Sequence, residues 1–157
     1  MGSQEGVVKI SAGQGQAFSV AGANLTWKAR GQDVDGGFCL FEQRLEAGEG
    51  VPLHTHSYPE SFYILQGEVE FSSGEQFEKL KCGPGDVVIA GPHVPHSFFN
   101  NGTATALLLS ISVAAHQAFF DAVEAADKNE PFARMNPADA FARVVKIGAE
   151  TDTNFKM

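Results

Sequence analysis

The spacing of hydrophobic positions changes near residue 115 of the chain. Before this point, short runs alternate apolar and polar residues and are separated by Gly and Pro, which is typical of β-strands joined by turns. Segments with this pattern are residues 7–10, 16–20, 25–29, 38–45, 61–66, 68–71, 76–81, 87–90, 96–100 and 104–113. Many short strands of this kind predict an all-β sandwich or barrel over residues 1–115.

The part of the chain after this point is predicted to be helical. A first helix is expected over residues 118–126, where the apolar positions share one face: Phe119, Val123 and Ala126. Asn136 is a suitable N-cap and Pro137 a suitable first residue for a second helix, and Gly148 fits its end. We therefore expect residues 116–157 to form a C-terminal helical extension packed on the barrel, with a frayed tail over residues 149–157.

Composition and charge narrow the classes of partner. A chain of 157 residues with 43% apolar residues is long enough to bury a core without a structural metal, so any metal would serve function. The net charge of -8, with no cluster of Lys and Arg, argues against nucleic acid or an anionic membrane as partner. No apolar run approaches the roughly twenty residues of a membrane span, and the first residues do not resemble a signal peptide. We expect a cytoplasmic protein in which Cys39 and Cys82 are reduced thiols.

The histidines supply the main chemical signal. His54 and His56 are two residues apart, so on a strand both imidazoles face the same side. Glu60 follows after a Pro that turns the chain, and His96 lies on another predicted strand. Three imidazoles and one carboxylate form a ligand set for one divalent transition ion, either Fe, Mn, Co, Ni, Cu or Zn. In six-coordinate geometry, two positions would remain open for substrate, water or dioxygen.

The same residues carry a family resemblance. Gly48, His54, His56, Glu60 and Gly67 stand at the spacing of the first cupin motif. The spacing of the second cupin motif is matched by Gly85, His96 and Asn100. The sequence therefore resembles single-domain cupins, which implies a double-stranded β-helix, a small jelly-roll barrel, around one metal ion. One departure is the segment Gly91-Pro92-His93, where the motif usually has Pro-x-Gly.

Several neighbouring residues have candidate roles. Phe62, Ile64 and Phe98 share strand parity with the proposed ligands and are predicted to line an apolar substrate pocket, although plain barrel core is an equal alternative. Tyr58 is either a hydrogen-bond donor to bound substrate or a turn tyrosine packed at the rim. His93 has the opposite parity to His96, so we expect it in a loop at the rim and do not count it as a ligand.

Two further polar residues have structural interpretations. Asn100 shares a strand face with His96 and is either a hydrogen-bonding partner of the site or, as the resemblance implies, a structural residue; we favour the latter. His116 has no partner in sequence and is assigned to a helix start or a dimer contact.

The predicted function follows from this site. Three neutral imidazoles and one carboxylate leave a divalent ion with a formal charge of about +1, which favours a small anionic or enolisable oxygen ligand. Resemblance to cupin dioxygenases such as quercetinases implies that Glu60 also acts as general base. We predict a metal-dependent dioxygenase acting on a small enolisable or phenolic, quercetin-like substrate. The alternatives are a non-redox isomerase, cyclase or decarboxylase, and a non-catalytic barrel that binds a small molecule.

A homodimer is also expected. The early segment over residues 7–20 begins almost without charge, and exposed strand edges are usually paired or covered. Pairing with the barrel of a second copy would cover it, as the resemblance to cupins implies. Alternatively, the apolar face of the helices caps the barrel within one chain. The residues of that face are Phe119, Val123, Phe141 and Val145.

Overall fold

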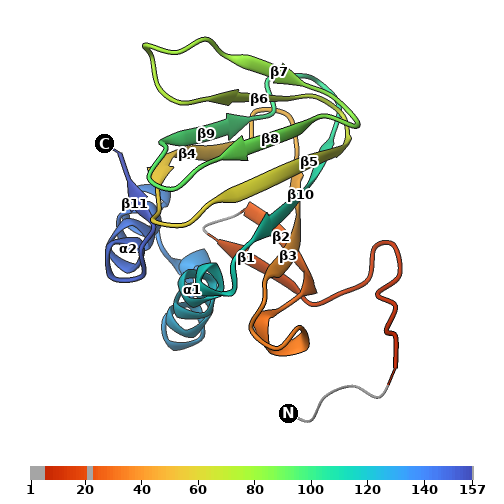
Figure 1. Cartoon of the computed structure of the whole chain (residues 1–157). Coiled ribbons are helices and arrows are strands. Elements are labelled where there is room, and N and C mark those ends of the chain that lie inside the picture. Colours follow the sequence, from red (N-terminus) through yellow and green to blue (C-terminus); the bar gives the residue numbers. More distant parts are fainter. Residues whose placement is uncertain (1–5, 21–22, 157) are drawn as a thin grey trace.

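The computed structural model describes residues 6–20 and 23–156, and these form two antiparallel sheets with helices at the C-terminal end (Figure 1). The first sheet has the spatial order β1 (Ala17–Val20), β2 (Ala23–Ala29), β3 (Cys39–Leu45), β10 (Ala106–Ser112), β5 (Glu60–Gln66) and β8 (Val87–Ala90). The second has the order β11 (Asn154–Phe155), β4 (Gly50–Thr55), β9 (His96–Phe99), β6 (Val69–Ser72) and β7 (Leu80–Cys82). The predicted all-β jelly-roll barrel with a C-terminal helical extension is confirmed.

The barrel core forms where the inward faces of the two sheets meet. Strand β3 shows the underlying pattern, since Cys39, Phe41, Gln43 and Leu45 are buried and the residues between them are more exposed. Side chains from both sheets pack together in one cluster, which comprises Leu45, Phe62, Ile64, Val69, Phe71, Cys82, Ala90, Phe98, Ala106 and Leu108. Cys39 and Cys82 are both free and buried.

The helical extension covers β1, β2 and β3. Its elements are α1 (Gln117–Asn129) and α2 (Pro137–Glu150), with short 3-10 turns at Ala114–His116 and Phe132–Arg134; a further 3-10 turn at Gly31–Asp33 precedes β3. A second apolar cluster joins the helices to the sheet, with Trp27 and Phe41 on the strands and Phe120, Val123 and Val144 on the helices. The helices therefore cap the barrel within the chain. Neither α-helix in the described ranges has the length and hydropathy that crossing a bilayer requires.

The boundaries of α2 confirm one expectation and correct another. The Asn136 side chain accepts a hydrogen bond from the Asp139 backbone N–H at 2.9 Å, and Pro137 occupies the first turn, as predicted. Gly148 does not end the helix, which continues to Glu150. A Cβ at Gly148 would lie 2.2 Å from the Thr153 carbonyl oxygen, so this glycine allows the returning chain to approach closely.

Three other expectations are corrected. Residues 7–10 form no strand, and within 76–81 only the end joins β7. The tail is ordered over residues 149–156, because β11 pairs with β4 through Asn154 with Thr55 and Phe155 with His54; residue 157 lies outside the described residues. This pairing satisfies backbone groups and places an aromatic ring near the histidine cluster, with 5.6 Å between the ring centroids of His54 and Phe155.

Candidate metal centre

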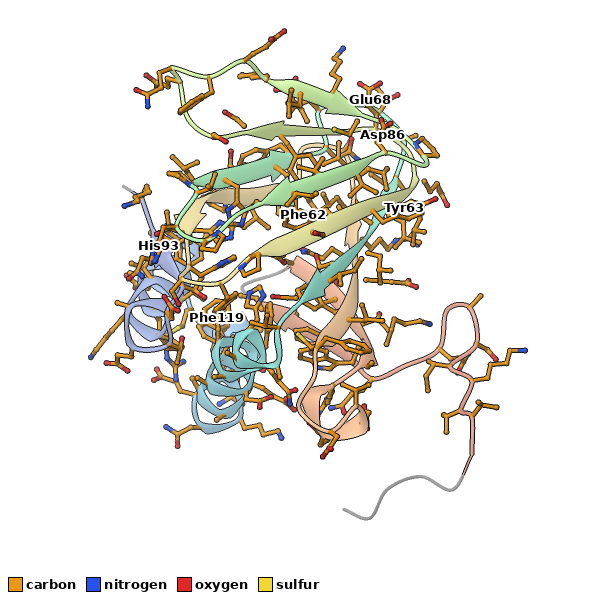
Figure 2. All side chains as sticks on the ribbon, viewed as in Figure 1. Phe62, Tyr63, Glu68, Asp86, His93 and Phe119 are labelled. Carbon is orange, nitrogen blue, oxygen red and sulfur yellow. The ribbon has the colours of Figure 1, made fainter. Side chains whose placement is uncertain are left out.

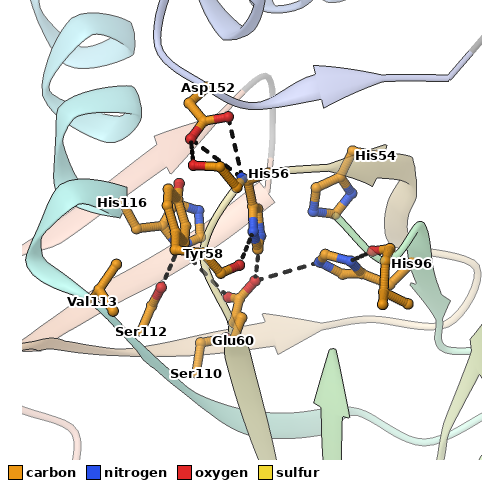
Figure 3. A network of polar contacts seen from close by, with 12 residues as sticks. His54, His56, Tyr58, Glu60, His96, Ser110, Ser112, Val113, His116 and Asp152 are labelled. Carbon is orange, nitrogen blue, oxygen red and sulfur yellow. Dashed lines mark hydrogen bonds and ion pairs between the residues drawn. The ribbon is translucent and has the colours of Figure 1, made fainter. Parts of the chain in front are cut away.

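The fold brings the four predicted ligands to one point inside the barrel. His54 is on β4, Glu60 begins β5, and His96 begins β9 directly opposite His54 in the sheet register. His56 follows β4 immediately. One ligand atom from each residue lies within 4.8 Å of the other three, and all four side chains are buried. Glu60 Oε1 lies 3.2 Å from His56 Nε2 and 3.5 Å from His96 Nε2 (Figure 3).

The backbone fixes the orientation of all three rings. In each histidine Nδ1 contacts a carbonyl oxygen, which can only accept, so Nδ1 carries the proton and donates. The acceptors are Pro52 for His54 (2.8 Å), Tyr58 for His56 (2.8 Å) and Val94 for His96 (2.9 Å). Nε2 of each neutral ring therefore presents a lone pair. This arrangement of tautomers is typical of histidines that bind a metal through Nε2.

The donor set fits a cation. In the tautomers described above, His56 and His96 direct Nε2 lone pairs toward the Glu60 carboxylate, so the cluster holds several acceptors. His96 Nε2 is enclosed and has no hydrogen-bond partner within residues 6–20 and 23–156. A buried acceptor left unpaired is costly, and a divalent ion would satisfy it together with the other donors.

Electrostatic surroundings favour the ligand forms of these groups. Burial lowers the pKa of His54 to about 3, so this imidazole is neutral at neutral pH. Burial favours a raised pKa for Glu60, but the facing His116, His56 and His96 outweigh burial and hold the pKa well below its usual range. Burial likewise lowers the pKa of His56, yet the adjacent carboxylate prevails and raises it overall. Without a metal, the site therefore holds an ionised carboxylate beside a neutral His54, and that carboxylate favours a proton on His56.

A mostly apolar cavity borders this cluster at His54 and Glu60. Its volume is about 490 Å³, and it runs between the barrel and the helical extension. The walls carry six phenylalanines, which are Phe41, Phe98, Phe99, Phe119, Phe120 and Phe141. Its polar side chains include His54, Glu60 and His116, together with Gln43, which donates to Ser110 Oγ at 3.0 Å. Figure 2 shows Phe119 on the helical side of the molecule and Phe62 within the barrel.

The residues predicted to line the substrate pocket lie in different parts of the structure. Phe98 lines the cavity, whereas Phe62 and Ile64 face inward, as their parity indicates, but are fully enclosed in the barrel core farther along β5. Phe62 borders a different cavity of about 80 Å³. Tyr58 is buried and stacks on the His56 ring with centroids 4.3 Å apart, so it packs against a candidate ligand.

His93 and Asn100 lie where the sequence placed them. His93 is exposed in the loop before β9, has a φ of 63°, and is absent from the cluster (Figure 2). Its backbone N–H donates to the His56 carbonyl at 2.8 Å, so its contribution to the site is through the main chain. The Asn100 amide donates to the carbonyls of Leu45 and Ala104, which is a structural role.

Sequence reasoning missed the position of His116. Its ring is 3% exposed, lines the cavity, and places Nδ1 3.0 Å from Ser112 Oγ and 3.8 Å from Glu60 Oε2 (Figure 3). It also begins the helical extension, as expected. The long separation from the other histidines in sequence gave no signal of this contact.

A double-stranded β-helix with a buried three-histidine, one-carboxylate cluster defines the class of protein. Residues 41–112 match the family model described as a cupin domain. A comparison with curated proteins finds no match. The chain is therefore similar to cupin domains over these residues, and the solved structures below share its fold.

Solved structures share the fold at low sequence identity. The polyketide cyclase RemF from Streptomyces resistomycificus is 19% identical, with a TM-score of 0.62 over 69% of this chain and 80% of that chain. A predicted oxalate decarboxylase from Thermotoga maritima is 22% identical, with a TM-score of 0.55 over 62% and 90%. An uncharacterised protein with a double-stranded β-helix domain from Klebsiella pneumoniae is 15% identical, with a TM-score of 0.56 over 71% and 91%.

Proposed function

We propose that this protein is a metal-dependent dioxygenase acting on a phenolic or enolic substrate, with the ion held by His54, His56, Glu60 and His96. The observation that carries the proposal is that His54 and Glu60 of this cluster lie in the wall of a phenylalanine-lined cavity. The cluster offers a metal site, and the cavity offers a mostly apolar space for an organic substrate next to it.

The donor set limits the chemistry. Bound there, a divalent transition ion supplies Lewis acidity toward a substrate oxygen and, when redox-active, the means to use dioxygen. In a dioxygenase reaction both atoms of dioxygen enter the organic product, and the substrate supplies the electrons. No separate reductant is required, which agrees with a cavity large enough for one organic ligand of ordinary size.

Glu60 has two different oxygens to offer. Oε1 faces His56 and His96, whereas Oε2 faces His116. The low pKa keeps the carboxylate ionised, which is the form that accepts a proton. We assign the role of general base to Oε2, which faces His116, because Oε1 is engaged with His56 and His96.

Oxygen uptake tests the proposal. Protein purified without added metal is analysed for its metal content and then assayed in an oxygen electrode against flavonols, naphthols and small enols. We expect one molecule of dioxygen consumed per substrate, with the activity lost in His96→Ala. His93→Ala is the matched control, since His93 is an exposed histidine three residues away, and its activity should persist.

Two outcomes would contradict the proposal. Conversion of a substrate under anaerobic conditions would assign the site to a non-redox isomerase, cyclase or decarboxylase. Binding without conversion across the whole panel by fully metal-loaded protein would assign it to a barrel that binds a small molecule.

A further inference from the structure

His116 is a polar side chain that the helical extension places beside a candidate ligand, with Nδ1 3.8 Å from Glu60 Oε2. It lies beyond residues 41–112, the part that matches the cupin domain. The ring packs against Phe41 and Phe120, with centroids 5.7 and 4.7 Å away. It belongs to a wall that this chain adds to the barrel.

The orientation of this ring leaves one nitrogen for a ligand. Nδ1 is turned toward the sheet, 3.0 Å from Ser112 Oγ and 3.8 Å from the Glu60 carboxylate. A proton on Nδ1 is favoured by that carboxylate, so Nε2 carries the lone pair. The hydrogen bonds within residues 6–20 and 23–156 include none to Nε2, since the ring is bonded through Nδ1. His116 is 3% exposed and lines the cavity, where a ligand can supply the partner for this nitrogen.

Apolar side chains of the same extension form the part of the cavity wall next to His116. Phe119, Phe120, Phe141 and Val144 face the cavity from α1 and α2. A volume of about 490 Å³ lies within the usual range of about 300–1,000 Å³ for sites that enclose a drug-sized ligand. The cavity is larger than a small polar acid would fill, and its mostly apolar surface offers such a molecule few hydrogen bonds.

We propose that His116 binds the hydroxyl group of an aromatic phenol or enol of at least two rings, whose apolar body lies against Phe119, Phe120 and Val144. This assignment deepens the proposed function, because it names the substrate class of the same site. The hydroxyl donates to His116 Nε2, and its oxygen lies on the side of the cavity where Glu60 and the candidate metal ligands stand. His116 is thus a substrate-binding and specificity-determining residue.

A pair of matched probes tests the hydroxyl contact in metal-free protein. 2-Naphthol and 2-methylnaphthalene have nearly the same size and differ in the group that can donate a hydrogen bond. Their dissociation constants are measured by equilibrium dialysis against wild type, His116→Phe and His116→Gln. Phe keeps an aromatic ring among Phe41 and Phe120 but accepts no hydrogen bond, whereas the Gln side chain retains a carbonyl acceptor.

The expected result is a change in preference. In His116→Phe the preference for 2-naphthol over 2-methylnaphthalene should fall about three- to tenfold, the usual effect of one hydrogen bond, and His116→Gln should restore part of it. A merely structural role of His116 would weaken both probes equally and leave their ratio unchanged. The proposal would be overturned if His116→Phe left the ratio of the two dissociation constants unchanged. It would also be overturned if Glu60→Gln lost the preference for 2-naphthol while His116→Phe kept it.

A second pair of variants tests the apolar wall without touching His116. Val144→Phe places a larger side chain against the cavity and should weaken both naphthalene probes by about tenfold or more, because space is lost. Val145→Phe, on the neighbouring face of the same helix and outside the cavity lining, is the control. Equal binding by wild type and Val144→Phe would overturn the placement of the aromatic body.

These measurements separate this inference from the proposed function. They use metal-free protein and require no turnover. If the protein prefers 2-naphthol through His116 but takes up no oxygen, the dioxygenase function is excluded and the binding role of His116 stands. If the protein takes up oxygen with a substrate that binds equally well to His116→Phe, the dioxygenase function stands and the binding role of His116 is excluded.

Discussion

Asn100 gives a sharp test of how the site is supported. The residue follows β9, is 1% exposed, and ties two loops together at the end of the barrel. Its amide Nδ2 donates to the carbonyls of Leu45 at 2.9 Å and Ala104 at 2.8 Å, and its Oδ1 accepts from the Gly102 backbone N–H at 3.0 Å. Asn100→Ala removes all three hydrogen bonds at once.

The cost follows from these contacts. One hydrogen bond contributes a net of about 0.5–1.5 kcal/mol, and a buried group left without a partner costs about 1–3 kcal/mol. We therefore expect the free energy of unfolding of Asn100→Ala to fall by about 3 kcal/mol. For a domain of this size, that loss corresponds to a decrease of about 6–12 °C in Tm. The metal content of the folded protein should not change, because these three bonds are to backbone groups.

Chemical denaturation and elemental analysis check this prediction together. Asn101→Ala is the control, since Asn101 is exposed and donates only to Glu70, and it should change the free energy of unfolding by less than about 0.5 kcal/mol. A loss below 1 kcal/mol in Asn100→Ala accompanied by loss of metal would refute the reasoning. Asn100 would then be a partner of the metal centre.

Further predictions concern the metal, pH and assembly. His54→Ala, His56→Ala and His96→Ala should each lose most bound metal and remain folded, as metal analysis and thermal melting will show; full metal retention would exclude that residue as a ligand. Glu60→Gln should retain more metal than these variants and lose turnover, because an amide oxygen still binds but accepts no proton; unchanged turnover would leave Glu60 a ligand only. Metal-free protein should lose stability as pH falls from 6.5 toward 3, because an unfolded histidine titrates near 6.5 whereas folded His54 and His116 have pKa values of about 3 and about 4. The raised pKa of His56 acts in the opposite direction. His54 alone gives a loss of about 2 kcal/mol at pH 5, measured by urea unfolding, and equal stability at pH 7 and 5 would contradict the prediction. We propose a homodimer held by the early segment, which deletion of residues 1–15 should dissociate or aggregate in light scattering; a monomeric full-length chain would end that proposal.

Local regularities explain which parts of the fold were predictable. The alternation in β3 and β10 reflects one buried and one exposed face, so the two strands could be located from the sequence. Asn136 and Pro137 mark a helix start through hydrogen bonding and restricted φ, which are properties of the residues themselves. Gly148 misled the sequence interpretation because glycine fits both a helix end and a close approach, and only the position of Thr153 separates the two.

Some residues of the candidate site could also be predicted from the sequence, and others could not. His54, His56, Glu60 and His96 were found because strand geometry converts their sequence spacing into proximity. His116 was not found, because it reaches Glu60 through the packing of the helical extension on the sheet, and no periodicity connects the two. Strand parity also could not decide whether Phe62 and Ile64 line the cavity or belong to the core, because residues of both kinds face inward from a strand. The structure places both in the core.

The pairing of β11 with β4 has a practical consequence for purification. Phe155 is paired with His54, and the Lys156 backbone N–H donates to the Leu53 carbonyl at 2.8 Å. A polyhistidine tag at the C-terminus would therefore follow a segment that is bonded beside a candidate ligand, and it would supply competing imidazoles for the same ion. Metal stoichiometry measured on such a fusion would mix the two populations. A tag that precedes residue 1 avoids this error, because the exposed segment at residues 6–10 extends away from the barrel (Figure 1).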